Sequence, residues 1–321
     1  MDHTSSASAA RGVFTGEVAA NRRLCRDHYR LDIALDAFPP SRSGQFLQVQ
    51  CRPPKAQTSA AEADWPADQP PRLSQPELLD AEPLLRRPLS LAGRADSPGG
   101  GVTLTVIHRV VGVGTRWLAG LAEGEAVSII GPLGNGFSIC EDAPRAALVG
   151  GGVGIPPLVY LAGELAAAGK KTIAFAGART GDLLPLTLVP GARADRDGRA
   201  TPCVAEFAAC GAETIAASDD GSVGLHGYIS EAFAAWLAGG GLAGGELAVY
   251  CCGPEEMMQA VAKTCIAAGV ACQLALERHM ACGMGACQSC VVKTAAPDPP
   301  GWKFSLCCTD GPVFDARRVL W

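Results

Sequence analysis

Three cysteines in the last part of the chain have the spacing of iron–sulfur ligands. Cys282, Cys287 and Cys290 form a C-x4-C-x2-C pattern, and a further pair, Cys307 and Cys308, follows a proline-rich gap. This spacing is typical of a [2Fe–2S] cluster, which takes three thiolates from one loop and a fourth from farther along the chain. Because such a cluster transfers single electrons, the pattern predicts part of an electron relay.

The residues between these cysteines suit a loop wrapped around a cluster. Gly283 and Gly285 permit positive φ angles and close approach of the backbone, and Ala286 and Ser289 are small. A structural zinc site is one alternative, although zinc ligands usually occur as two CxxC pairs. Chance clustering in a chain with 14 cysteines is another.

The third alternative is a set of disulfides, which would require an oxidising compartment. Residues 1–11 are small and polar and lack the charged-then-apolar order of a signal peptide. We therefore expect a cytoplasmic protein with reduced thiols. A net charge of −5 argues against a nucleic-acid partner, and no apolar run reaches the ~18–20 residues needed to span a bilayer.

Two short motifs in the first half of the chain have residue types that bind phosphates. In Arg86-Arg87-Pro88-Leu89-Ser90, a guanidinium could bind a pyrophosphate and the hydroxyl a flavin edge. The turn 112–115 (Gly-Val-Gly-Thr) offers backbone N–H groups and a hydroxyl to a phosphate. The dense glycine loop 131–137 could turn beside a ligand or simply join two domains. A solvated arginine pair and an ordinary glycine turn are the alternatives for the first two motifs.

Two further segments predict a dinucleotide site. A glycine-rich run follows a short apolar strand and precedes a helix, where N–H groups favour anions. It is not a complete G-x-G-x-x-G motif, because Pro157 occupies the third glycine position. A Cys-Gly-Pro turn ends another strand of the same predicted sheet, and ligands bind at such strand ends. Its cysteine could lie against a nicotinamide or be an inert buried thiol. The candidate residues are Gly150, Gly151, Gly152, Gly154, Cys252, Gly253 and Pro254.

Hydrophobic patterning divides the chain into four parts. Residues 1–11 form a tail, and 12–142 contain short strands with Gly/Pro turns that predict a closed β-barrel, interrupted by a Pro-rich surface insertion at 53–85. Residues 143–276 alternate strands with helices, which predicts a Rossmann-like parallel sheet. Residues 277–321 form a small segment that we expect the cluster to hold together.

Three details of this division can be checked against the structure. The last barrel strand is predicted at 126–130 and should end at Gly131-Pro132, and 271–276 is the final strand predicted for the sheet. The five histidines show no ligand spacing, so we expect most of them at the surface or in loops.

In order, these motifs resemble those of the ferredoxin–NADP reductase superfamily. More narrowly, they are similar to the electron-transfer subunits of NAD-dependent class 1B dihydroorotate dehydrogenases. The similarity covers nearly the whole chain outside 1–11 and 53–85. It implies a barrel that binds FAD, an NAD domain and a [2Fe–2S] domain, with Cys308 as the fourth cluster ligand. The FAD-lining residues that it implies are Arg87, Pro88, Leu89, Ser90, Ile107, His108, Arg109, Gly114 and Thr115. The family commonly has tyrosine where His108 stands.

The resemblance also implies a function. Electrons would pass from dihydroorotate through the FMN of a catalytic partner to the cluster, then to FAD and NAD+, in pyrimidine biosynthesis. The expected assembly is a heterotetramer with two copies of each subunit. The main alternative is a related reductase subunit that serves a sulfite reductase, hydrogenase or sulfide dehydrogenase. A non-enzymatic metal-binding module is the third hypothesis.

Overall fold

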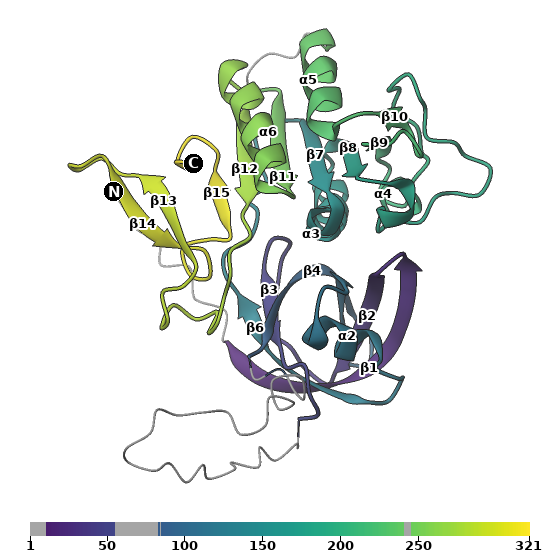
Figure 1. Cartoon of the computed structure of the whole chain (residues 1–321), viewed down its shortest axis with the longest axis vertical. Coiled ribbons are helices and arrows are strands. Elements are labelled where there is room, and N and C mark those ends of the chain that lie inside the picture. Colours follow the sequence, from purple (N-terminus) through teal and green to yellow (C-terminus); the bar gives the residue numbers. More distant parts are fainter. Residues whose placement is uncertain (1–10, 55–82, 84, 241–244) are drawn as a thin grey trace, which may run out of the picture.

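The computed structural model describes residues 11–54, 83, 85–240 and 245–321, and it contains three sheets. A closed barrel lies below a larger, mostly parallel sheet, and a two-stranded hairpin lies beside both (Figure 1). The predicted fold class is therefore confirmed. Most of the predicted tail (1–11) and of the predicted insertion (53–85) lies outside the described residues.

The barrel has six antiparallel strands in the order β1-β2-β5-β4-β3-β6. They are β1 (Gly12–Cys25), β2 (His28–Leu35), β3 (Phe46–Val49), β4 (Arg87–Asp96), β5 (Val102–Arg109) and β6 (Ala126–Leu133). Alternation decides which side chains fill the barrel. On β3, Leu47 and Val49 point into the barrel core, whereas Phe46 packs outside it with residues of the other domains. A short helix, α2 (Val113–Ala119), adds Leu118 to the barrel core.

The last barrel strand is longer than predicted. The sequence placed its end at Gly131-Pro132, but β6 continues to Leu133, which pairs with Phe46 of β3. A register shift between β3 and β6 accommodates the proline, which cannot donate a ladder hydrogen bond. A side chain at Gly131 would also lie 2.6 Å from Leu47, so glycine is required there by packing.

The second sheet has seven strands in the order β10-β9-β8-β7-β11-β12-β15. They are β7 (Arg145–Gly151), β8 (Lys171–Ala178), β9 (Glu213–Ser218), β10 (Leu225–His226), β11 (Leu247–Cys252), β12 (Ala271–Ala275) and β15 (Val313–Asp315). The longer helices are α3 (Ile155–Ala167), α5 (Ile229–Gly239) and α6 (Glu255–Ala267), and the short ones are η1 (Gly152–Gly154), η2 (Gly181–Leu183) and α4 (Ala205–Ala208). The core of α3 and that of α5 and α6 are separate, so helices cover both faces.

The edge of this sheet corrects one prediction. The patterning predicts 271–276 as the final strand of the sheet, but β15 adds a further strand, antiparallel to β12. The C-terminal segment is also not held by a cluster alone, since Phe314 and Val319 belong to the core beneath α5 and α6. A strand of only three residues has too little alternation to be recognised from sequence. The hairpin β13 (Val291–Ala295) and β14 (Trp302–Leu306) completes the segment.

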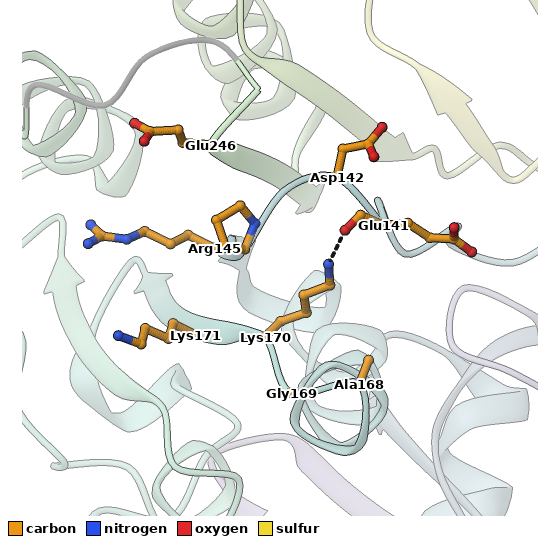
Figure 2. Close-up of a pocket in the computed structure, with 9 residues that line it drawn as sticks. Glu141, Asp142, Arg145, Ala168, Gly169, Lys170, Lys171 and Glu246 are labelled. Carbon is orange, nitrogen blue, oxygen red and sulfur yellow. Dashed lines mark hydrogen bonds between the residues drawn. The ribbon is translucent and has the colours of Figure 1, made fainter.

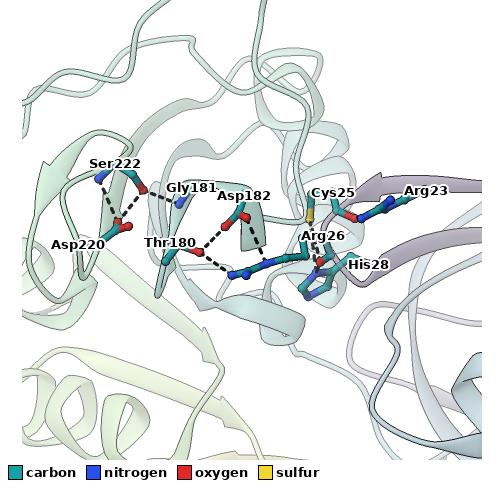
Figure 3. Close-up of polar contacts among 9 residues, drawn as sticks. All are labelled: Arg23, Cys25, Arg26, His28, Thr180, Gly181, Asp182, Asp220 and Ser222. Atoms are coloured by element: carbon teal, nitrogen blue, oxygen red, sulfur yellow. Dashed lines mark hydrogen bonds and ion pairs between the residues drawn. The ribbon is translucent and has the colours of Figure 1, made fainter.

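The barrel and the sheet are linked by several contacts, two of which lie at α3 and at the turn between β1 and β2. Beneath α3, the Tyr160 hydroxyl donates to the Ser41 carbonyl at 2.9 Å, and the Ser43 amide donates to Glu164 at 3.1 Å. At the turn between β1 and β2, Arg26 forms an ion pair of 3.1 Å with Asp182, shown in Figure 3. These contacts fix the position of the barrel relative to the sheet. No helix among the described residues is long and apolar enough to cross a membrane.

Candidate cofactor sites

The two neighbouring arginines at the start of β4 have different surroundings. Arg86 donates to the carbonyl of Ser128 at 2.8 Å and to its hydroxyl at 2.9 Å, and it also contacts Gln50 at 3.1 Å. These bonds brace the barrel. Arg87 instead lies beside Gly114, where an added Cβ would be 3.3 Å from the Arg87 Nε. The fold therefore brings the predicted arginine and the predicted glycine turn together.

The remaining residues of the β4 motif alternate between the two faces of the strand. Pro88 and Ser90 are half-buried and pair across strands with Gln48 and Phe46 of β3, on the outer face of the barrel. Leu89 pairs with Leu47 and packs against the barrel core. Pro88 and Ser90 are thus available to a ligand, whereas Leu89 can contribute only its backbone.

The β5 motif contains buried polar atoms without a protein partner. His108 Nε2 lies 3.2 Å from the Thr115 carbonyl, but its Nδ1 and the Nε of Arg109 are buried without one. Buried polar atoms are normally satisfied, so each of these atoms indicates a missing polar partner. Because His108 and Arg109 are successive residues of β5, they lie on opposite faces of the strand, and only Arg109 is on the outer face of the barrel. The Thr115 hydroxyl is less available than predicted, because it accepts the amide N–H groups of Val111 (2.9 Å) and Gly112 (3.2 Å).

Two of the four histidines among the described residues, His226 and His279, are exposed as predicted, and the other two are not. His28 and His108 are buried on adjacent strands, although most histidines were expected at the surface or in loops. Burial lowers the pKa of His108 to about 4, so its ring is neutral near pH 7. Burial lowers the pKa of His28 as well. His108 has the inward register of β5, with Leu104 and Val106, whereas His28 is on the outer side of β2, opposite Arg109. Both are covered by residues distant in sequence, which local sequence does not reveal.

The predicted dinucleotide loops meet at the carboxyl ends of two adjacent parallel strands. Cys252 of β11 pairs with Gly150 of β7. A side chain at Gly154 would lie 2.3 Å from the Cys252 carbonyl, and one at Gly151 would lie 2.9 Å from Pro254. The loops can pack this closely only because glycines occupy these positions.

This junction is also where the strand order of the sheet reverses. Strands β8, β9 and β10 extend to one side of β7, while β11 and β12 extend to the other. Open α/β sheets bind ligands at such a switch point. Gly152 has a φ of +52° and no atom within 4 Å of an added Cβ, so its backbone faces open space. Cys252 is half-buried, and burial raises the pKa of its thiol to about 12, which keeps it uncharged.

The cysteines of the C-terminal segment lie in two neighbouring pairs. The Cys287 amide donates to Cys282 Sγ at 3.4 Å, and the Cys308 amide donates to Cys290 Sγ at 3.4 Å. The backbone of Gly285 hydrogen bonds to the Cys308 thiol, which brings the two pairs into contact. Within the part of the chain that the structure describes, no three His, Cys, Asp or Glu side chains converge on a single-ion site. Two pairs suit two irons better than one tetrahedral zinc ion.

The loop also carries backbone features that suit a cluster. Gly283 and Gly285 have positive φ angles of 71° and 88°. The Ser289 hydroxyl, with neighbouring hydrogen bonds, lowers the pKa of Cys287 to about 6, which favours the thiolate that binds iron.

Geometry distinguishes Cys307 from Cys308. The Cys307 thiol donates to the Leu276 carbonyl at 3.1 Å, whereas the Cys308 thiol hydrogen bonds with Cys290 and lies near Cys282. Burial raises the pKa of each thiol to about 12, so acidity does not separate the two. This arrangement supports Cys308 as the fourth ligand.

The loop 131–137 positions the segment that follows Cys308, a role that the sequence did not reveal. Asn135 donates to the carbonyls of Asp310 (3.1 Å) and Val313 (2.9 Å), and its side-chain oxygen accepts the Val313 amide at 2.9 Å. The backbone N–H of Asn135 donates to the Gly311 carbonyl at 2.6 Å. Asn135 therefore fixes the distance between the barrel and the fourth cysteine.

One hollow of the described surface is not part of these sites. It has a volume of about 540 Å³ and is lined by residues such as Arg145, Lys170 and Glu246, drawn in Figure 2. Arg145 and Lys171 begin β7 and β8, so the hollow lies at the amino ends of the strands. The candidate nucleotide loops lie at the opposite ends.

Comparisons with known proteins agree with this geometry. Residues 277–320 match the iron–sulfur cluster binding domain of dihydroorotate dehydrogenase B, and residues 148–263 match the oxidoreductase NAD-binding domain. Among solved structures, an NADH-dependent reduced ferredoxin-NADP oxidoreductase has a TM-score of 0.69 at 24% identity and covers 95% of this chain and 90% of its own. Phthalate dioxygenase reductase has a TM-score of 0.52 at 18% identity and covers 92% of this chain and 77% of its own.

Relatives known by sequence are closer. The chain is 30% identical over 304 residues to the dihydroorotate dehydrogenase B (NAD(+)) electron transfer subunit of Caldanaerobacter subterraneus subsp. tengcongensis, covering 94% of this chain and 96% of that protein. It is 38% identical over 244 residues to the subunit of the same name from Bacillus caldolyticus, covering 75% and 82%.

Fold and site together define an NAD-linked oxidoreductase with the ferredoxin reductase fold and a C-terminal iron–sulfur domain. Within that class, the chain belongs to the family of dihydroorotate dehydrogenase B (NAD(+)) electron transfer subunits.

Proposed function

We propose that this chain carries electrons from a dihydroorotate-oxidising partner to NAD+ in pyrimidine biosynthesis. The observation that carries the proposal is the adjacency of two candidate sites. Gln48 of β3 pairs with Pro88 in the β4 motif, and its side chain lies against Gly283 of the cysteine loop. A flavin on the outer face of β4 would therefore lie beside a cluster held by the cysteine pairs.

The FAD site is formed by the β4 and β5 motifs and the turn at Gly114. Arg87, which is not used to brace the barrel, binds the pyrophosphate. Pro88 and Ser90 line the ring, and the unpartnered Arg109 Nε binds a polar group of the cofactor. His108, on the inner face of β5, supports the site from behind by its contact with the Thr115 carbonyl. The proposed FAD site is further lined by Ile107, Gly114 and Thr115, and Leu89 contributes its backbone to it. When bound, FAD accepts single electrons and delivers a hydride to NAD+.

The remaining sites hold the two ends of the relay. Cys282 and Cys287 hold one iron, and Cys290 and Cys308 hold the other, in keeping with their pairing. The loop 150–154 binds the NAD pyrophosphate at the start of α3, and the turn 252–254 lies against the nicotinamide.

The partner in this proposal is an FMN-containing catalytic subunit, and the complex is a heterotetramer with two copies of each chain in the cytoplasm. The relatives are named as electron transfer subunits, which supports a division of labour between two proteins. The sites proposed for this chain hold FAD, the cluster and NAD, so the proposal assigns oxidation of dihydroorotate to the partner.

The test is to purify the chain alone and with its partner. We expect FAD, iron and acid-labile sulfide in the chain, NADH oxidation with an artificial acceptor, and NAD+ reduction by dihydroorotate only in the complex. Zinc in place of iron, or FMN in place of FAD, would contradict the proposal. A loaded complex that reduces NAD+ with another donor but not with dihydroorotate would identify a related reductase instead.

A further inference from the structure

One buried side chain between the two candidate redox sites has no hydrogen-bond partner. Gln48 is completely buried, and neither its amide nitrogen nor its amide oxygen has a partner in the structure. Burying an amide whose nitrogen and oxygen are both unsatisfied is unfavourable. Such a group in a well-packed strand therefore indicates a partner supplied by something bound nearby.

The direction of the Gln48 side chain is fixed by its strand. Its neighbours Leu47 and Val49 point into the barrel core, so Gln48 points outward with Phe46. On that outer face its cross-strand neighbour is Pro88, which the proposed FAD site uses.

The other end of the side chain meets the cysteine loop. A Cβ placed on Gly283 would lie 2.6 Å from Gln48 Nε2, so the amide nitrogen lies directly against the residue that follows Cys282. Gly283 is itself buried with a positive φ of 71°, which allows this contact. Gln48 therefore spans the space between the flavin-facing strand and the cysteine loop.

We propose that Gln48 is a positioning residue for electron transfer, whose amide N–H donates to the sulfur of the cluster held by the cysteine loop. This inference rests on the proposed cluster and FAD sites. Hydrogen bonds to cluster sulfur are one of the protein features that set the reduction potential. An N–H donor stabilises the more negative, reduced state, so Gln48 raises the potential of the cluster and fixes the loop at a constant distance from β4.

The test compares Gln48→Leu and Gln48→Met with wild type in the full-length, cofactor-loaded chain. Both variants keep the bulk of the side chain and remove the donor. Gln273→Leu is the matched control. This substitution also removes a side-chain amide that donates a hydrogen bond, to the Ser138 carbonyl at 2.7 Å, but Gln273 lies on β12 and not in the cysteine loop. The readouts are iron, sulfide and FAD content, and the midpoint potential of the cluster from a redox titration followed by its absorbance.

We expect both Gln48 variants to keep FAD and iron. Their cluster potential should be more negative than that of wild type by ~59 mV, which corresponds to about a tenfold change in the one-electron equilibrium constant. The Gln273 variant should match wild type. A wild-type potential in either Gln48 variant, or an equal shift in the control, would overturn the inference. Loss of the cluster from both Gln48 variants would also overturn it, because the side chain would then be structural. A wild-type chain without iron or FAD would instead refute the proposed function.

Discussion

Replacement of Asn135 by alanine should loosen the cluster segment by an amount that the structure allows us to work out. The side chain makes three hydrogen bonds to residues 310 and 313, with lengths of 2.9–3.1 Å. At about 0.5–1.5 kcal/mol for each bond, their loss should lower the free energy of unfolding by about 1.5–4.5 kcal/mol. Because Cys308 lies just before this segment, the variant should also bind less iron and sulfide.

Asn21 provides the matched control for this experiment. Its side-chain amide donates to the carbonyls of Leu118 and Leu121 at 2.9 and 2.8 Å, within the barrel and far from the cysteines. Asn21→Ala should therefore cost about 1–3 kcal/mol but leave the iron content unchanged. Urea denaturation measures the stability, and colorimetric iron and sulfide assays measure the loading. Wild-type stability and iron in Asn135→Ala, or equal iron loss in Asn21→Ala, would refute the reasoning.

Three further outcomes follow from the candidate sites. Cys308→Ser should lose most of the iron and sulfide. Cys307→Ser should keep them, because a serine hydroxyl can also donate to the Leu276 carbonyl that Cys307 contacts. The reverse pattern in the iron assay would show that the fourth ligand is misassigned. Arg87→Ala should weaken FAD binding by about 1.5–3 kcal/mol, measured by titrating the apoprotein with FAD, and unchanged affinity would exclude a phosphate contact. The folded pKa of His108 is about 4 and the unfolded value ~6.5, so the unfolded chain takes up the proton first as the pH falls. The stability contributed by neutral His108 should therefore be complete above pH ~6.5 and fall by about 3 kcal/mol between pH 6.5 and 4. In denaturation curves recorded across this range, His108→Gln should reduce the fall in the free energy of unfolding. The same fall with pH in the variant and in wild type would contradict the prediction.

Local sequence was enough to predict the closed barrel, the alternation of strands and helices that follows it and the cysteine loop, but not strands β9 and β10 of the larger sheet. Glycine and proline punctuate the barrel strands, and the apolar runs of β7 and β11 alternate with helices α3 and α6. The C-x4-C-x2-C spacing is itself short, so its meaning does not depend on distant contacts.

Features that depend on distant segments were not predictable in the same way. Asn135 lies in a glycine loop, and its partners are 175 and 178 residues away in the sequence. Gln48 resembles an exposed polar residue on an alternating strand, and it is buried only because the cysteine loop covers it. The distinction between Arg86 and Arg87 likewise depends on β6, which provides Ser128 to the first and not to the second.

The addition of β15 to the parallel sheet has a consequence for synthesis of the chain. Residues 313–315 leave the ribosome after every other strand of that sheet, so the hydrogen-bonding edge of β12 stays open until then. Open strand edges pair readily with other chains. A nascent or truncated chain that ends before β15 should therefore aggregate more readily than the complete sheet. Cys308 is placed beside Cys290 by the β13–β14 hairpin, which precedes β15 in the chain, so the metal-binding residues can assemble before this edge is closed.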